Sequence, residues 1–200
     1  MSPRFLLTLF IALCPASPVY AGVDVERALK ACHSTCLAHG PDFDRTVEAA
    51  RGRGWTPVSG DTLATLAPVA NVEAAKAWTT AADDTMPRGS VVGVTRARLD
   101  GKAVQTCTVA MTDVDHELFL KSFFTRTDAE KIDEERNAVQ ISRFYILIAG
   151  GREQFVNLKF PASPTAEGSI VASSIADDGL EVEHYDLRNC NPDQTGDRFR

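Results

Sequence analysis

The stretch SVVGVTRARLDGKAVQTCTVAM, residues 90–111, predicts an antiparallel hairpin at the centre of the fold. Its Asp100-Gly101 pair favours a two-residue turn, in which both positions need a positive φ angle. Such a turn fixes the strand register, so Val94 is expected to face Cys107 across the pair. One face of the hairpin then carries a run of apolar side chains, namely Val92, Val94, Cys107, Val109 and Met111. We therefore expect Cys107 to point into the core.

Two further stretches predict strands. Residues 138–161, AVQISRFYILIAGGREQFVNLKFP, predict a second hairpin with its turn at the Gly-Gly pair. Residues 169–187, SIVASSIADDGLEVEHYDL, predict two more strands around an Asp-Gly turn, although the first half of this stretch also suits a short helix. Both turns use the backbone freedom that glycine supplies.

Capping residues mark the predicted helices. Residues 24–38 predict a helix with Asp24 at its N-cap, and Asp42 is expected to cap a second helix directly after it. Thr112 and Thr127 are each followed three residues later by an acidic residue, and these capping boxes predict two more helices. The second of these would be short and acidic.

Residues 56–90 are rich in Ala, Thr and Pro and have no clear periodicity. They predict either two short helices, near residues 62–66 and 72–82, or a flexible insert. The order along the chain is therefore helices, a hairpin, a helix and then strands. This order predicts an α+β fold, in which an antiparallel sheet built from hairpins has the N-terminal and central helices packed on one face.

Residues 1–21 have the features of a secretory signal peptide. Arg4 gives a positive start, an apolar run follows, and small residues end at Ala21. The apolar run is shorter than the roughly 18 residues that a membrane span requires. We expect cleavage after Ala21, which places the protein in the periplasm or outside the cell. Lipidation at Cys14 is the alternative, but Leu13 is larger than the residue that normally precedes a lipidated cysteine.

The remaining chain predicts one domain over residues 22–190 and a loose tail over residues 191–200. The whole chain of 200 residues carries a formal net charge of −6 at pH 7. This charge, spread without a basic cluster, argues against a nucleic-acid partner. After the signal peptide, no apolar stretch is long enough to predict a membrane span.

Four cysteines follow the expected cleavage site, namely Cys32, Cys36, Cys107 and Cys190. An even number in an exported chain predicts two disulfides. Residues four apart share a helix face, so one of the first two cysteines can meet Cys107 on the sheet. We favour Cys36–Cys107 together with Cys32–Cys190, which staples the helices to the sheet. The exchanged pairing remains open, as does a Cys32–Cys36 bond that would strain the helix.

The stretch ACHSTC, residues 31–36, does not have the spacing of other cysteine chemistry. Haem attachment requires Cys-x-x-Cys-His, and the usual redox motif is Cys-x-x-Cys near a βαβ unit. Here three residues separate the cysteines, and His33 lies between them. A zinc site of four thiolates would need free thiols in an oxidising compartment. We therefore expect no metal and no cofactor.

The stretch DVDHE, residues 113–117, places Asp113, Asp115 and His116 close together. Such residues can form part of a metal-assisted hydrolytic site. Acidic residues at the start of a helix also stabilise it simply by complementing the helix dipole. The chain has no G-x-S-x-G motif that would predict a serine nucleophile.

The leading functional hypothesis is a non-catalytic binding or interaction protein of the cell envelope, whose partner is an envelope or secreted protein. One alternative is a hydrolase that uses the acidic stretch at residues 113–117. Another is a small-ligand carrier, with a cavity lined by Phe119, Phe123, Phe124 and Phe144. Trp55 and Trp78 could anchor a partner if exposed, although tryptophan in a small domain more often belongs to the core.

Overall fold

The computed structural model describes residues 20–59, 63, 66–162 and 169–177, and their side chains from Val25 onward. The predicted signal peptide lies almost wholly outside the described residues, and so does the predicted C-terminal tail. None of the helices in the described part of the chain has the length and apolar character that crossing a membrane requires.

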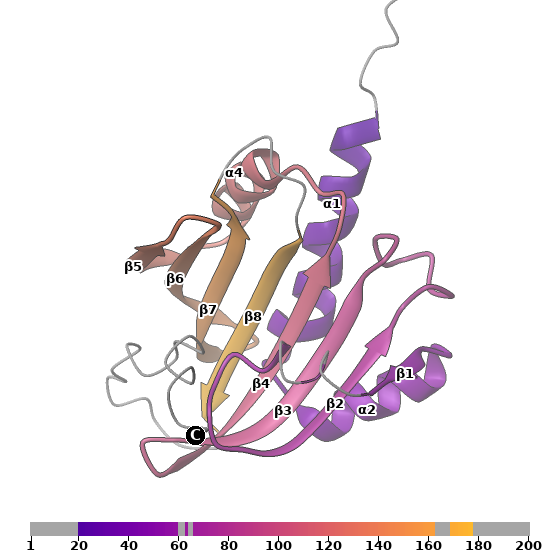
Figure 1. The fold of residues 1–200 in the computed structure, drawn as a ribbon, viewed down its shortest axis with the longest axis vertical. Coiled ribbons are helices and arrows are strands. Elements are labelled where there is room, and N and C mark those ends of the chain that lie inside the picture. The colour runs from indigo at the N-terminus through magenta and orange to yellow at the C-terminus, as the bar shows by residue number, and fades with distance from the viewer. Residues whose placement is uncertain (1–19, 60–62, 64–65, 163–168, 178–200) are drawn as a thin grey trace, which may run out of the picture.

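The described strands form one antiparallel sheet of eight strands in the order β1-β2-β3-β4-β8-β7-β6-β5 (Figure 1). The sheet therefore consists of two four-stranded meanders, which meet where β4 pairs with β8. The strands are β1 (Thr56–Val58), β2 (Val72–Thr79), β3 (Val91–Leu99), β4 (Lys102–Met111), β5 (Glu130–Arg136), β6 (Gln140–Ala149), β7 (Arg152–Pro161) and β8 (Ile170–Asp177).

A helical segment precedes each meander. The first meander follows α1 (Tyr20–Cys32), the short π-helix η1 (His33–Leu37) and α2 (Phe43–Gly52), and the second follows α4 (His116–Arg126). Helices α1 and α4 lie beside each other, and the Arg126 guanidinium of α4 donates two hydrogen bonds to the Glu26 carboxylate of α1. The sheet and the helices thus share a large apolar core.

The predicted central hairpin is confirmed with its register. Val94 faces Cys107 across β3 and β4, and the turn residues Asp100 and Gly101 have φ angles of 50° and 82°. The five apolar residues expected on one face are all fully buried. This hairpin folds as predicted because its turn chemistry and its alternating pattern specify the same register.

The second hairpin, β6–β7, is also confirmed, with its turn at Gly150-Gly151. Gly150 has a φ angle of 60°, and a Cβ atom added there would lie 2.5 Å from the carbonyl oxygen of Ala38. Only glycine fits this close approach, which brings the turn against the chain after η1. In the stretch predicted to form two strands, Ile170–Asp177 is strand β8 and not a helix, whereas the predicted Asp-Gly turn and second strand lie outside the described residues.

Two predicted helices are wrong. Val72–Thr79 forms β2 and Glu130–Arg136 forms β5. Alanine-rich VEAAKAWT shows little alternation, and EKIDEER is almost wholly charged, so neither pattern indicates a strand. Both segments become strands because a neighbouring strand pairs with them along their length, which overrides weak local preference.

The predicted helix ends are partly right. Asp42 caps α2, since its side chain accepts a hydrogen bond from the backbone N–H of Arg45 at 2.9 Å. Helix α1 already begins at Tyr20, so Asp24 is not its N-cap. Helix α4 is capped by Asp115 rather than Thr112, because the Asp115 carboxylate reaches the backbone N–H of Leu118 at 3.0 Å.

Candidate functional site

A disulfide joins Cys36 of η1 to Cys107 of β4, with a Cα–Cα distance of 5.3 Å. These are the two cysteines that the favoured pairing joined. The bond fastens the helical segment to the middle of the sheet across 71 residues of sequence. Its role is structural, because both cysteines are buried.

Cys32 forms no disulfide within the described residues, and its expected partner Cys190 lies outside them. The Cys32 sulfur is buried 4.0 Å from the sulfur of Met111. Burial raises the pKa of this thiol to about 12, so almost no thiolate exists at neutral pH. Cys32 is therefore neither a nucleophile nor a metal ligand in this state, and neighbouring His33 is exposed.

The acidic stretch at residues 113–117 does not converge on a common point. The Asp115 carboxylate caps α4, and the His116 ring stacks on Phe160 with 5.6 Å between ring centroids. Asp113 has a φ angle of 57° in the turn before the helix. No group of three His, Cys, Asp or Glu side chains in the described part of the chain is placed to hold a metal ion.

The four phenylalanines of the carrier hypothesis are not all brought together. Phe123 and Phe124 pack around Tyr145, with centroid distances of 5.9 and 5.1 Å, and Phe119 stacks on Phe123. Phe144 is the neighbour of Tyr145 in β6, and successive strand residues point to opposite faces of a sheet. Phe144 therefore lies on the other side of the sheet from this aromatic cluster.

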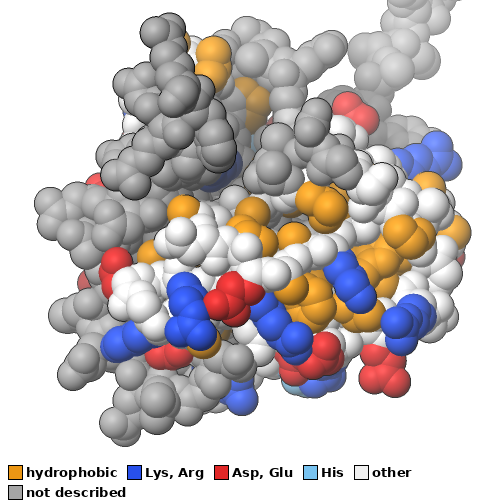
Figure 2. Space-filling view, turned by 60° about the horizontal axis from the view of Figure 1, so that its bottom comes forward, with side chains coloured by type: hydrophobic (Ala, Val, Ile, Leu, Met, Phe, Trp, Pro, Cys, Tyr) orange, Lys and Arg blue, Asp and Glu red, His pale blue; other side chains and the backbone are white. Residues whose placement is uncertain are grey.

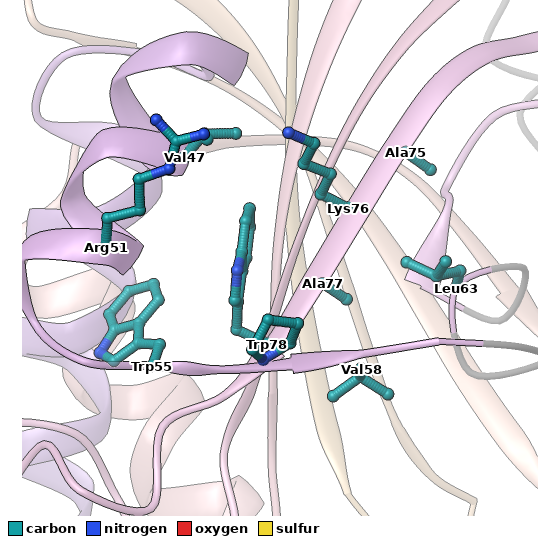
Figure 3. Close-up of a pocket in the computed structure, with 10 residues that line it drawn as sticks. Val47, Arg51, Trp55, Val58, Leu63, Ala75, Lys76, Ala77 and Trp78 are labelled. Atoms are coloured by element: carbon teal, nitrogen blue, oxygen red, sulfur yellow. The ribbon is translucent and has the colours of Figure 1, made fainter.

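A pocket of about 370 Å³ lies where α2 faces the outer strands β1 and β2 (Figure 3). Its volume is near the lower end of the range for small-ligand sites, about 300–1,000 Å³. The lining residues are Val47 and Arg51 of α2, Trp55 between α2 and β1, Pro57 and Val58 of β1, Leu63, and Ala75, Lys76, Ala77 and Trp78 of β2. The wall is thus apolar and aromatic, with two basic side chains.

Two tryptophans make one wall of this pocket. Trp55 and Trp78 are both buried, and their ring centroids lie 6.5 Å apart. The indole N–H of Trp55 donates to the Asp83 carboxylate at 2.9 Å. Both tryptophans are therefore core residues, as is usual for tryptophan in a small domain. Part of each ring also lines a cavity that is open to solvent.

The basic side chains of the pocket have no acidic partner among the described residues. Arg53, close by, pairs with Asp83, but neither Arg51 nor Lys76 forms an ion pair with a described carboxylate. Lys76 instead lies over the ring of Phe43, at 5.8 Å from its centroid. In Figure 3 the two cationic ends lie at the same end of the pocket, on either side of the Trp78 ring. This arrangement suits an anionic group with an apolar stem.

The surrounding surface is also partly apolar. Figure 2 shows apolar side chains gathered toward the right, the side of α2, β1 and β2 in Figure 1, with basic and acidic side chains between and below them. The area beside this pocket thus combines apolar side chains with charges of both signs. Sequence reasoning identified both tryptophans but not Arg51 or Lys76, because only the folded sheet brings Lys76 beside α2.

Asp83 supports the tryptophan wall, and its titration can be followed. Burial tends to raise the pKa of its carboxyl, but hydrogen bonds from Thr85 and Trp55 and the charge of Arg53 lower it below its usual value. Because the pKa of Asp83 is lower in the folded state, its ionised carboxylate stabilises the fold at pH values above the unfolded-state pKa, near 3.9. This stabilisation is lost as the pH falls through the folded-state pKa.

We therefore expect Asp83→Asn to make unfolding less dependent on pH below about pH 4. Urea unfolding at a series of pH values, followed by tryptophan fluorescence, measures this dependence. Asp84→Asn removes an exposed carboxylate next in sequence and should leave the pH dependence unchanged. Equal profiles for the two variants would show that the Asp83 contacts do not stabilise the fold.

No family model, curated protein or solved structure matches this chain. Function is therefore inferred from the geometry of the described residues.

Proposed function

We propose that this protein is an exported, non-catalytic binding protein of the cell envelope, and that the pocket between α2 and β2 receives an anionic group of its partner. The observation that carries the proposal is the pair Arg51 and Lys76, two cations without described acidic partners beside an aromatic wall. In a chain of net charge −6, two neighbouring cations without a described acidic partner create a local positive potential that attracts an anionic group.

Export is the second part of the proposal. It is supported by the signal-peptide features of residues 1–21 and by the Cys36–Cys107 disulfide, since disulfides persist mainly in oxidising compartments. We expect the mature protein, in the periplasm or secreted, to begin at Gly22. Mass spectrometry of the intact protein from producing cells measures this, and a mature chain that retains residues 1–21 would contradict it.

The proposed arrangement has the N-terminal and central helices on one face of the sheet. Alternate residues of β4 support this, because Gln105, Cys107 and Met111 all point to one face and contact α2, η1 and α1 in turn. Helix α4 then joins the same layer through its contact with α1. In this arrangement α2 forms the outer end of the layer, where the pocket opens.

Catalysis has less support than binding. A metal-assisted hydrolase would need Asp113 and His116 to converge with other ligands, and the described residues bring no such group together. A carrier for a free small anion is the second candidate, since the pocket volume suits a small ligand. This candidate is tested by measuring whether a free small anion binds in the same pocket.

Photocrosslinking in intact cells tests the binding site. A photoreactive residue replacing Val58 in the pocket should form an adduct with the partner, whereas one replacing exposed Val139 in the turn between β5 and β6 should not. Arg51→Glu with Lys76→Glu should reduce the adduct at least about tenfold, because each charged contact contributes about 1.5 kcal/mol or more.

The matched control is Arg45→Glu with Lys30→Glu, which makes the same change of charge at exposed positions outside the pocket. This control should keep the adduct. Equal adducts from Val58 and Val139, or equal loss in both charge variants, would reject the pocket as the binding site. Thermal unfolding of each variant checks that the fold is retained.

A further inference from the structure

We propose that the occupant of the pocket is an extended, acidic segment of the partner protein, which adds as a new strand to the outer edge of β2 and places a carboxylate between Arg51 and Lys76. This inference rests on the proposed binding function and names the chemistry of the partner. It follows from the edge of the sheet, the shape of the pocket and the local charge.

The outer edge of β2 is only partly covered. Strand β1 pairs with Ala77, Trp78 and Thr79, whereas Val72–Lys76 pairs with β3 alone among the described strands. Exposed backbone N–H and C=O groups on such an edge can pair with another chain. Strand addition at this edge would place the new segment beside Val72–Lys76, which β1 does not reach.

The pairing of β1 shows which groups of β2 point outward. Pro57 faces Trp78 and has no N–H to donate, so we take this as a non-hydrogen-bonded pair of the ladder. In an antiparallel ladder such positions alternate with hydrogen-bonded ones. Ala77 and then Ala75 therefore direct their N–H and C=O groups outward, and those of Ala75 lie beyond the end of β1.

The pocket wraps around this same edge. Lys76 and Trp78 point to one face of β2, and Ala75 and Ala77 point to the other, yet all four line the pocket. Figure 3 shows the two alanines on the opposite side of the strand from Lys76. A cavity lined from both faces of a strand must pass its outer edge, so an occupant of the pocket lies next to the backbone of Ala75, which no described strand pairs with on that side.

The opposite edge of the sheet, at β5, is protected against strand addition. Strand β5 is rich in charged residues, and there Glu134 binds both Lys131 and Arg143, at 3.0 and 2.8 Å. Charges and bulges of this kind discourage strand addition. The open part of β2 also has a bulge, between Val72 and Ala74, and an ion pair of Glu73 with Arg98, but beyond these lies small Ala75, which lines the pocket.

Charge selects an acidic segment. The nearby cations Arg53 and Arg96 are already paired, with Asp83 and Asp44, whereas the two cations of the pocket have no such partner among described residues. In a strand that follows the edge, alternate side chains point toward α2, and one of them can enter between Arg51 and Lys76. A carboxylate there would gain two charge-assisted contacts in a site partly shielded by Trp78.

Nuclear magnetic resonance of the ¹⁵N-labelled mature chain tests the inference with synthetic probes. The parent probe is a short capped peptide of alternating threonine and valine with a central glutamate. We expect it to shift the amide signals of Val72–Lys76 and the indole signal of Trp78. Glutamine at the centre should weaken binding about tenfold, the effect of losing about 1.4 kcal/mol. Arg51→Glu with Lys76→Glu should reverse the preference toward a central lysine.

A second probe separates strand addition from simple ion binding. The same glutamate peptide with N-methyl groups on alternate amides keeps its carboxylate but cannot pair along an edge. We expect its binding to be lost. If it binds as well as the parent, or if glutarate alone shifts the same signals at equal concentration, strand addition is rejected while the pocket still binds an anion. If the parent peptide does not bind at millimolar concentration, the inference fails, and photocrosslinking at Val58 decides the proposed function independently.

Discussion

Replacing Cys36 and Cys107 together with alanine is expected to lower the free energy of unfolding by about 4 kcal/mol. The bond joins residues with a sequence separation of 71. A cross-link that closes so long a loop removes much of the conformational freedom of the unfolded chain. The bond also fixes η1 on the sheet at a point where both cysteines are buried. Urea unfolding of the oxidised wild type and the double variant gives the difference.

Two controls make this result interpretable. Under reducing conditions the wild type should resemble the double variant, because both then lack every disulfide and differ only in two buried sulfur atoms. Cys32→Ala removes a buried thiol on the neighbouring turn and should cost only about 1 kcal/mol, if Cys32 carries no bond of its own. A difference below about 1 kcal/mol between oxidised wild type and the double variant would contradict the loop-closure argument.

Gln154→Leu should lower the free energy of unfolding by about 3 kcal/mol, although leucine has a similar size. Gln154 of β7 is fully buried, and its amide N–H groups donate to the carbonyl oxygens of Leu37 and Ala149 at 2.8 and 2.9 Å. Its side-chain oxygen accepts from the Ser174 hydroxyl at 2.7 Å. Leucine cannot form these hydrogen bonds, so the two carbonyl oxygens and the Ser174 hydroxyl would each lose this partner inside the protein.

The Ser174 contact allows a double-mutant test. Ser174→Ala alone should cost about 1 kcal/mol, because it leaves one side-chain acceptor of Gln154 unpaired. In the Gln154→Leu background the same change should cost almost nothing, since the hydroxyl has already lost this partner. Additive costs would mean that the two side chains stabilise the fold separately, and that the short contact between them contributes little.

The centre of the sheet could be predicted from sequence, and its edges could not. Strands β3, β4, β6 and β7 are mostly buried, their apolar residues follow the strand period, and an Asp-Gly pair and a Gly-Gly pair mark the two turns. At the edges, exposed side chains carry no such constraint. EKIDEER in β5 follows a capping box and predicts a helix from sequence, and only the pairing with β6 makes it a strand.

The candidate site was harder to predict because its residues are distant in sequence and individually ordinary. Arg51 has the pattern of a basic residue that ends a helix, and Lys76 has that of a surface lysine. Their proximity depends on β2 being a strand, which the sequence did not indicate. The acidic stretch at residues 113–117 drew attention for its composition, yet Asp115 serves as a helix cap.

The meeting of the two meanders at β4 and β8 also constrains how the chain is made. Cys36 and Cys107 both precede β5 along the chain, so the first meander can acquire its covalent link before the second one is in place. Strand β4 ends at Met111, whereas its partner β8 ends at Asp177. Until β8 is in place, the buried strand β4 has an unpaired edge, which a chaperone or a second unfolded copy can occupy.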